Sequence, residues 1–331
     1  MAQALYFVAP KRVEVREVPL DTDLDEGQVL VRTEYSGISA GTELLAFRGQ
    51  LDPELPLDET IGALAGTFRY PFRYGYSCAG RVERSRGRLT EGALVVALHP
   101  HQDRFVLADG DVIVLESHDD ARVATLFPLV ETALQVCLDA GERLCEHVVV
   151  VGLGVVGILT ACLLQRSGAS VIAAEPRPWR RRAAEAFGVR AVGPEKLADE
   201  VDERTGGSGV PLLVELSGQP AALAQGLPLL AHEGCALVAS WYGTKEVSLP
   251  LGAAFHRRRL TLRSTQVSTV PAHLGSRWTV ARRRAATRDL LGELPLGRLA
   301  THEFALSQAQ EAFDAIDRQE QELLHVALRH G

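Results

Sequence analysis

A glycine-rich turn in the middle of the chain constrains the fold more than any other feature of the sequence. In the stretch HVVVVGLGVVGILTACLLQRSGASVIAAE, Gly152, Gly154 and Gly157 follow an all-valine strand run and open a helical run. A second apolar strand run ends at Glu175. Strand, glycine turn, helix and strand in this order form the context in which a G-x-G-x-x-G pattern binds the pyrophosphate of a dinucleotide. An ordinary glycine-rich turn between a strand and a helix is the alternative.

Each position of the turn has a different expected role. Gly152 permits the tight bend, Gly154 lets the pyrophosphate approach the backbone, and Gly157 brings the helix close to the strand. Val155 and Val156 lie at the helix N-terminus, where free backbone N–H groups and a partial positive charge favour an anion. We therefore expect these five residues to bind the cofactor phosphates.

The residue that ends the second strand bears on the choice of cofactor. A carboxylate at Glu175 is placed to accept hydrogen bonds from the adenosine ribose hydroxyls and to repel a 2′-phosphate, which favours NAD. The segment PRPWRRR follows at once, and Arg177, Arg180 or Arg181 can instead pair with such a phosphate. A solvated first helical turn is the plainer interpretation of these arginines. The sequence favours NAD and leaves NADP possible.

The pattern of the chain indicates two domains. Residues 1–120 contain short alternating runs such as RVEVREV, broken by turn residues, which predict a mainly antiparallel β domain. Residues 121–266 alternate helical segments with continuous apolar runs, which predicts βαβ units on a parallel sheet. The tail, residues 267–331, has strand-like runs that need a sheet to join, and we expect it to complete the first domain.

Composition excludes several classes of function. The formal net charge of −7 argues against a nucleic-acid partner. We find neither a secretory signal nor an apolar stretch of about 20 residues, so we expect a cytoplasmic protein with no membrane partner. The five cysteines are scattered and form no C-x-x-C pair. This spacing suits a reduced compartment and argues against a thiolate zinc site.

These features together resemble the medium-chain dehydrogenase/reductase superfamily. The resemblance rests on EGQVLVRTEYSGIS and GYSCAGRV in the β domain, VVVVGLGVVG in the middle, and THEFALSQAQEAFDAI in the tail. Within the superfamily, SGISAGTE, FPLVETALQV and WYGTKEVSLPLGAAFHRRRL are most similar to the branch of bacteriochlorophyllide side-chain alcohol dehydrogenases. The resemblance implies a Rossmann doubly wound sheet, a GroES-like mainly-β substrate domain, and an active site in the cleft between them.

The resemblance fails at the zinc-ligand positions. Zinc alcohol dehydrogenases of this superfamily use a Cys in the bend, a His in the next strand, and a Cys or Glu at the start of the linking helix. The matching positions here are Ser39, Tyr76 and Phe127 or Pro128. Zinc prefers thiolate, imidazole or carboxylate ligands. The four-cysteine lobe of the structural zinc is also missing, and the short HPHQDRFVL stands in its place. We expect no zinc at either site.

Without a metal, another group must handle the proton that accompanies hydride transfer. Tyr76 is the first candidate, because a phenol can donate to an alkoxide and can be activated by a neighbouring cation. A strand tyrosine that fills the former metal pocket is the alternative. His99 and His101 are candidates for a proton shuttle near neutral pH. Ser39 and Thr42 are expected either to orient a substrate hydroxyl or to bond their own backbone.

Further candidates come from the linking helix and the strand ends. Glu131 is expected to bind a polar substrate or set the pKa of Tyr76 or His101, unless it lies on the helix surface. The resemblance places Thr132 against the nicotinamide. Ends of parallel strands bind ligands in open α/β sheets, which adds the residues Ser217, Trp241 and Tyr242 along the nicotinamide half of the cofactor. The basic cluster 277–288 is expected to be solvated.

The sequence thus predicts a zinc-independent, NAD(P)-dependent oxidoreductase. It is expected to act on a secondary alcohol or ketone of a biosynthetic small molecule. Reduction of an enone or quinone C=C bond, and cofactor binding without turnover, are the alternatives. A homodimer is expected, because pairing through the Rossmann sheet edge is common in the superfamily.

Overall fold

The computed structural model describes residues 1–116 and 120–331, which form two compact units. We call them the β unit (Met1–Pro128 and Leu299–Gly331) and the α/β unit (Leu129–Arg298). The boundaries differ from the expected ones mainly in the tail, because residues 267–298 group with the α/β unit. The reason is visible in helix α8 (Val280–Glu293), whose Arg283 makes a buried ion pair with Glu131 on helix α3 (Phe127–Ala140).

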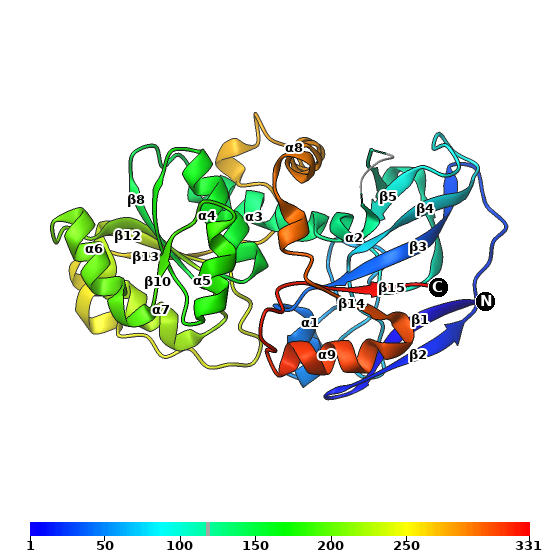
Figure 1. The fold of residues 1–331 in the computed structure, drawn as a ribbon, viewed down its shortest axis with the longest axis horizontal. Coiled ribbons are helices and arrows are strands. Elements are labelled where there is room, and N and C mark those ends of the chain that lie inside the picture. Colours follow the sequence, from blue (N-terminus) through cyan, green and yellow to red (C-terminus); the bar gives the residue numbers. More distant parts are fainter. Residues whose placement is uncertain (117–119) are drawn as a thin grey trace. The chain divides into compact units, whose positions relative to one another are not determined.

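The β unit is built around a seven-stranded sheet. Its main path runs β14-β15-β3-β4-β5-β7, and β6 also pairs with β3. The strands are β3 (Gln28–Ile38), β4 (Cys78–Ser85), β5 (Leu94–Ala97), β6 (Arg104–Ala108), β7 (Val112–Val114), β14 (His302–Ala305) and β15 (Val326–Arg329). Figure 1 shows β15, from the tail, beside β3, and the two are antiparallel with Val326 opposite Ile38. The returning tail therefore completes the first sheet, as the sequence indicates.

A second layer of the β unit holds most of its aromatic core. It comprises the hairpin β1 (Ala2–Ala9) and β2 (Arg12–Val18) with helices α1 (Glu43–Arg48) and α9 (Ala309–Asp317), and α2 (Ala121–Ala124) lies elsewhere in the unit. Phe7 stacks on Phe72, and its ring meets the edge of Phe313, each at 5.3 Å between centroids. Phe47 of α1 stacks on Phe313 at 5.2 Å. These rings fix α1, and with it the chain just before α1, against the tail helix.

The α/β unit contains a six-stranded sheet in which every pairing is parallel. Its order is β10-β9-β8-β11-β12-β13. The strands are β8 (His147–Val151), β9 (Ser170–Ala174), β10 (Ala191–Val192), β11 (Val210–Glu215), β12 (Leu230–Val238) and β13 (Thr261–Ser264), and the other helices are α4 (Val155–Arg166), α5 (Pro178–Glu185), α6 (Leu197–Thr205) and α7 (Pro220–Gly226). Counted within the unit, this is the 3-2-1-4-5-6 order of a Rossmann sheet. The predicted fold class is confirmed.

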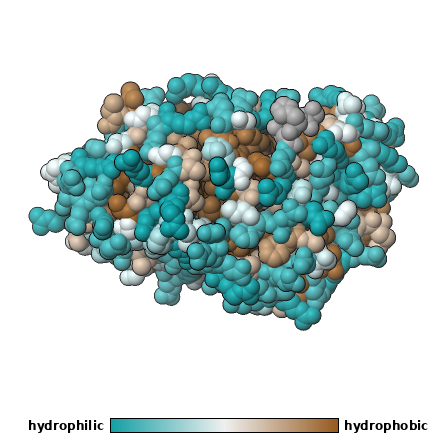
Figure 2. All heavy atoms as spheres, viewed as in Figure 1, coloured by the Kyte–Doolittle hydropathy of each residue, from teal (hydrophilic) through white to brown (hydrophobic). Residues whose placement is uncertain are grey.

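The face of the molecule seen in Figure 2 is mainly hydrophilic. Figure 2 shows hydrophilic residues over most of the visible face, with smaller hydrophobic areas between them. The large apolar side chains that are most exposed include Leu144 and Trp241, at 72% and 43%. Within residues 1–116 and 120–331, no helix is both long and apolar enough to cross a membrane.

Buried imidazoles make the β unit sensitive to acid. Burial lowers the pKa of His99 to about 4 and the pKa values of His325 and His330 to about 3. The folded state therefore keeps these side chains neutral at pH values where the unfolded chain, with a histidine pKa of about 6.5, binds protons. Because the unfolded state then binds more protons, the free energy of unfolding falls as pH falls below about 6.5.

We expect the His325→Gln variant to lose stability less steeply in acid. Removing one such histidine should reduce the slope of the unfolding free energy against pH by up to about 1.4 kcal/mol per pH unit. Urea unfolding between about pH 7.5 and about pH 5 measures this slope. A wild-type protein whose stability is constant over that range would contradict the assignment of neutral buried imidazoles.

Candidate active site

The glycine turn between β8 and α4 has the geometry that the fingerprint requires. Gly152 adopts φ +93°, and a Cβ added there would lie 2.6 Å from the Cα of Ser217. A Cβ on Gly157 would lie 2.0 Å from the carbonyl oxygen of Gly152, whereas a Cβ on Gly154 would meet no described atom within 4 Å. Packing thus requires a glycine at positions 152 and 157. Gly154 faces open space, to which the N-terminal N–H groups of α4 are also directed.

Glu175 links the end of β9 to this turn. Its carboxylate is 2% exposed and accepts hydrogen bonds from the backbone N–H groups of Leu153 and Arg177, at 2.9 and 3.0 Å. Guanidinium nitrogens of Arg177 and Arg180 lie 3.9 Å from its two oxygens. Burial lowers the pKa of Arg180. The arginines are therefore grouped around Glu175 rather than spread over a solvated turn, and the turn fits a dinucleotide.

A second buried carboxylate, which the sequence did not single out, ends β11. Glu215 is fully buried and accepts hydrogen bonds from the N–H and hydroxyl of Ser217, at 2.7 and 2.5 Å. Its other oxygen accepts from the Tyr242 hydroxyl at 2.7 Å, and burial together with Glu215 raises the pKa of Tyr242. Glu215 thus fixes Ser217 and Tyr242 near Gly152. Its signal in the sequence is one glutamate at the end of the apolar run VPLLVELSG.

The Ser217 segment is also tied to the chain after β12. The backbone N–H of Gly218 donates to the hydroxyl of Ser240 at 2.9 Å, and Lys245 Nζ donates to the Gly218 carbonyl at 2.9 Å. Trp241 lies between these contacts in the sequence and is 43% exposed. The ends of β11 and β12 therefore present an aromatic side chain beside a rigid polar frame.

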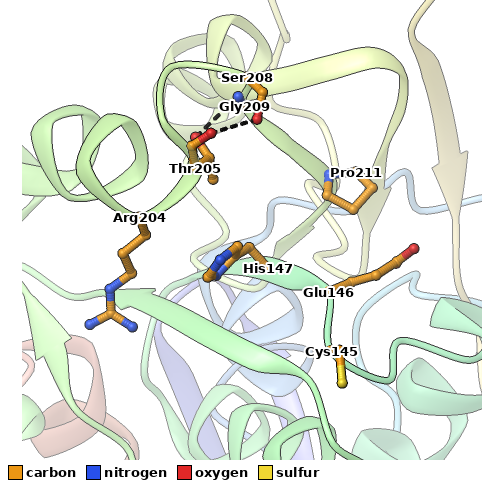
Figure 3. Close-up of a pocket in the computed structure, with 8 residues that line it drawn as sticks. All are labelled: Cys145, Glu146, His147, Arg204, Thr205, Ser208, Gly209 and Pro211. Atoms are coloured by element: carbon orange, nitrogen blue, oxygen red, sulfur yellow. Dashed lines mark hydrogen bonds between the residues drawn. The ribbon is translucent and has the colours of Figure 1, made fainter.

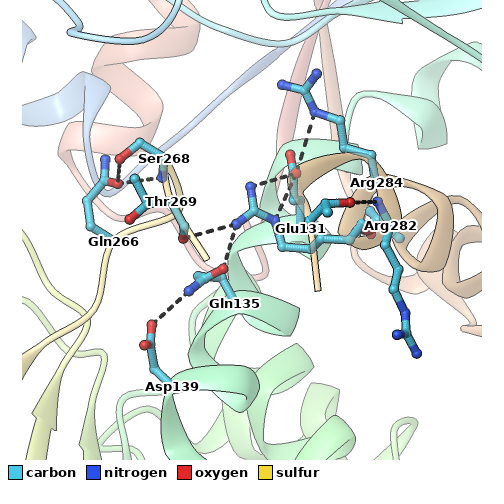
Figure 4. A network of polar contacts seen from close by, with 11 residues as sticks. Glu131, Gln135, Asp139, Gln266, Ser268, Thr269, Arg282 and Arg284 are labelled. Atoms are coloured by element: carbon cyan, nitrogen blue, oxygen red, sulfur yellow. Dashed lines mark hydrogen bonds and ion pairs between the residues drawn. The ribbon is translucent and has the colours of Figure 1, made fainter. Parts of the chain in front are cut away.

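Glu131 has a partner that the sequence analysis missed. It is 3% exposed, and its Oε1 lies 3.0 Å from both Nε and Nη2 of Arg283, which is itself 2% exposed. Arg283 Nη1 also donates to Gln135 Oε1 at 2.5 Å. Figure 4 shows Glu131 and Gln135 in this network and the Arg282 side chain pointing away from Glu131.

This network corrects two expectations. Arg283 is buried rather than solvated, because its guanidinium is paired on α3, while Arg282 is exposed and the partly buried Arg284 has its Nε 3.6 Å from the Glu131 carboxylate. Glu131 is buried rather than on the helix surface, and within the α/β unit its carboxylate anchors α8 through Arg283. Thr132, the next residue of α3, is partly exposed.

In the β unit, the structure brings together three of the predicted catalytic side chains. The side chains of Ser39 and Thr42 lie beside the Tyr76 hydroxyl and act to lower its pKa. Burial and the nearby Glu43 carboxylate raise the pKa of Tyr76 to about 12. The charge beside this phenol is therefore negative and opposes its ionisation, where the sequence analysis considered a cation. At neutral pH Tyr76 is a proton donor.

The two histidines of HPHQDRFVL have different environments. His99 stacks on Phe105 at 3.9 Å between centroids, and its Nδ1 bonds the Pro100 carbonyl at 2.9 Å. Its pKa of about 4 is incompatible with a proton shuttle near neutral pH. His101 is fully buried and lies between Ser36 and Glu43, with both ring nitrogens bonded at 2.7 Å.

Glu43 is a buried carboxylate of the bend that the sequence pattern did not single out. It is the first residue of α1, is fully buried, and accepts the backbone N–H of Ser39 at 2.8 Å. Gly75, at φ +106°, precedes Tyr76, and a Cβ there would lie 2.6 Å from the His101 ring. The bend, His101 and Tyr76 are therefore closely packed. The sequence signal was a glutamate directly before the apolar run LLAF.

The metal positions of the zinc relatives carry poor zinc ligands. They hold the hydroxyl of Ser39, the phenol of Tyr76, and the buried apolar Phe127. In the part of the chain that the structure describes, no three His, Cys, Asp or Glu side chains are grouped to hold a metal ion. The donor set does not fit Zn²⁺, which takes thiolate, imidazole or carboxylate.

A hollow of about 310 Å³ lies elsewhere in the α/β unit (Figure 3). It is lined by Cys145, Glu146, His147, Arg204, Thr205, Ser208, Gly209 and Pro211. Because His147 begins β8 and the glycine turn follows the other end of that strand, this hollow lies away from the turn. It contains none of the predicted site residues.

Comparisons with known proteins agree with this architecture. Residues 155–281 match the model of the zinc-binding dehydrogenase family. L-Threonine 3-dehydrogenase of Pyrococcus abyssi is 30% identical over 180 residues, covering 53% of this chain and 49% of the relative. The chain thus aligns with about half the length of this curated relative.

Two solved structures are similar over nearly the whole chain. 2R,3R-Butanediol dehydrogenase from Bacillus subtilis superimposes with a TM-score of 0.80 at 19% identity, covering 99% of both chains. An alcohol dehydrogenase from Thermotoga maritima gives 0.80 at 20% identity, covering 100% of this chain and 99% of its own. At this identity the similarity establishes the fold alone, which the chain shares with these two dehydrogenases.

We expect Gly154→Ala and Gly157→Ala to separate binding from folding. The methyl group at position 154 enters open space, so the melting temperature should be kept while NAD affinity falls by roughly tenfold or more. The methyl group at position 157 meets the Gly152 carbonyl and should lower the melting temperature. Gly292→Ala, which meets no described atom within 4 Å in α8, is the control. Calorimetric titration measures affinity, and an unchanged affinity in Gly154→Ala would place the dinucleotide elsewhere.

Proposed function

We propose that the chain is a zinc-independent medium-chain dehydrogenase/reductase. In this proposal it transfers a hydride between a nicotinamide cofactor and a secondary alcohol or ketone of a biosynthetic small molecule. One observation carries the proposal. The protonated Tyr76 phenol, beside Ser39 and Thr42, stands at a zinc-ligand position of the relatives, in a chain that also has a complete dinucleotide turn.

The α/β unit supplies the groups that would hold the cofactor. Gly154 and the first turn of α4 would contact the pyrophosphate, and Glu175 would accept from the adenosine ribose. Ser217 and Trp241 would lie along the nicotinamide half. When bound, the nicotinamide supplies or accepts the hydride. Because the Glu175 carboxylate opposes a 2′-phosphate, we propose NAD as the cofactor.

Tyr76 determines the direction in which the chemistry is easiest. A phenol whose pKa is about 12 keeps its proton at neutral pH and donates it to the oxygen of a carbonyl as that oxygen gains charge. In the reverse reaction the base is the Tyr76 tyrosinate, and little tyrosinate is present until the pH is high. Ser39 and Thr42 hold the phenol in position. We therefore propose ketone reduction as the reaction favoured near neutral pH.

The reactions should differ in their pH dependence. Ketone reduction should vary little between about pH 6 and about pH 9, whereas alcohol oxidation should rise across the same range, because only oxidation requires the tyrosinate. Initial rates in both directions measure this. An oxidation rate that falls as pH rises would contradict Tyr76 as the proton acceptor.

Tyr76→Phe should lower kcat by roughly 10² and keep the cofactor affinity, because it removes the donor without touching the α/β unit. Tyr74→Phe is the matched control, since Tyr74 is a buried tyrosine whose ring packs against Tyr76 at 6.2 Å. An equal loss in both variants would indicate a packing defect, and an unchanged kcat in Tyr76→Phe would remove Tyr76 from the mechanism.

Labelled cofactor distinguishes the alternatives. With a 4-deuterated reduced cofactor, deuterium should appear on the carbinol carbon of the product. Deuterium on a carbon β to a carbonyl would instead establish reduction of an enone. Tight cofactor binding without turnover of alcohols, ketones and enones would support a binding protein. Full activity after dialysis against a chelator, with no zinc by elemental analysis, is the expected result for a zinc-independent enzyme.

A further inference from the structure

The segment that follows β13 is anchored at both of its ends to a network on helix α3. At its start, the Thr265 hydroxyl donates to Asp139 Oδ2 at 2.5 Å. At its end, Arg283 Nη1 donates to the Thr269 carbonyl at 3.3 Å. We call residues 265–269 the β13 segment. All of them are at least partly exposed, so these anchors, rather than burial, hold the segment in place.

The two anchors belong to one row of polar side chains along α3. Glu131, Gln135 and Asp139 are spaced four residues apart and therefore share one face of the helix. Arg283 donates to Glu131 and Gln135, and Gln135 Nε2 donates to Asp139 Oδ2 at 2.9 Å. Figure 4 shows these three side chains along α3, with Thr269 beside them. Arg283 is thus bonded to one anchor directly and to the other through Gln135.

The shape of the guanidinium suits this role. An arginine carries its N–H donors in a fixed planar fork, whereas a lysine carries its donors on a single nitrogen. In Arg283, Nε and Nη2 meet Glu131, while Nη1 meets both Gln135 and Thr269. A lysine at this position keeps the charge opposite Glu131 but cannot span all of these partners.

The β13 segment lies at the cofactor edge of the parallel sheet. The glycine turn follows β8, Ser217 follows β11, and Trp241 follows β12. Because the strands are parallel, their carboxyl ends lie at the same edge, where open α/β sheets bind ligands. In the sheet order, β13 lies on the side of β8 opposite β9, the strand that leads to Glu175. Glu175 is the proposed partner of the adenosine ribose, so the β13 segment belongs to the nicotinamide half.

We propose that Arg283 is a positioning residue for the nicotinamide half of the cofactor, because it holds the β13 segment in place. The inference rests on the proposed function, which puts the cofactor in this unit. A segment that is ordered before binding does not have to be ordered by the ligand, so less of the interaction energy is lost. Arg283 acts in this role through residues 265–269 and not by contact with the reacting atoms.

Two ligands separate this role from a general structural one. ADP-ribose has the adenosine, pyrophosphate and second ribose of NADH but lacks the nicotinamide. In Arg283→Lys, the affinity for NADH should fall by roughly tenfold or more, while the affinity for ADP-ribose should change by less than about twofold. Calorimetric titration of the full chain measures both affinities. An equal fall for both ligands, or no fall for NADH, would overturn the inference.

A variant at the other anchor leaves the buried ion pair untouched. Thr265→Val removes the hydroxyl that donates to Asp139, and it should lower the affinity for NADH and keep the affinity for ADP-ribose. Thr205→Val is the matched control, since the Thr205 hydroxyl donates to the Val201 carbonyl at 2.7 Å and lies in the hollow of Figure 3. The control should keep both affinities. An unchanged NADH affinity in Thr265→Val would overturn the inference even if Arg283→Lys does not fold.

Hydrogen exchange of the ligand-free protein gives a readout that needs no cofactor. In Arg283→Lys, amide exchange in the β13 segment should be faster than in wild type, and exchange in the glycine turn should be unchanged. Unchanged exchange in the β13 segment would contradict its anchoring by Arg283. If wild type binds neither NADH nor ADP-ribose, the proposed function fails, and this inference fails with it. If wild type binds both and Arg283→Lys loses both equally, only the inference fails.

Discussion

The antiparallel register between β3 and β15 is the constraint on which the candidate active site depends. It sets Leu328 opposite Ser36, so that the tail reaches a serine 294 residues from His330 in sequence. A buried hydroxyl in a central strand needs partners, and this register supplies one from the tail while His101 supplies the other. Shifting the register by one residue would send these side chains to the opposite face of the sheet. The chemistry of the bend is therefore tied to correct pairing of the two ends of the β unit.

The fold was predictable because it rests on local patterns. The glycine turn, the all-valine strand and the alternation of strands with helices each report on residues close in sequence, and the structure confirms a Rossmann sheet. The division of the tail between the two units was harder to predict. Helix α8 belongs with the α/β unit because of one buried ion pair, Arg283 with Glu131, formed between residues 152 apart. A run of three arginines gives no sign of which one is buried.

The same limit explains which site residues were missed. Ser39 and Tyr76 were singled out because they stand at zinc-ligand positions of related proteins, and Thr42 because its hydroxyl lies in the same bend as Ser39. Glu43 and Glu215 were missed because a buried carboxylate is recognised by its partners, and those partners come from elsewhere in the chain. His101 was singled out as a candidate for a proton shuttle near neutral pH, and the structure shows that it is fully buried. Residue type alone could not distinguish the two histidines. His101 is hydrogen-bonded to Ser36 and Glu43, whereas His99 stacks on Phe105.

Gly75 has a consequence for how such a site can change over time. Its left-handed backbone lets the chain pass the His101 ring and leaves no room for a side chain. Tyr76 and His101 are therefore neighbours only while position 75 stays a glycine. A lineage in which this tyrosine replaced a metal-binding residue would have to keep a glycine at position 75. A substitution of Tyr76 alone does not strain the backbone. A substitution of Gly75 would displace both Tyr76 and His101.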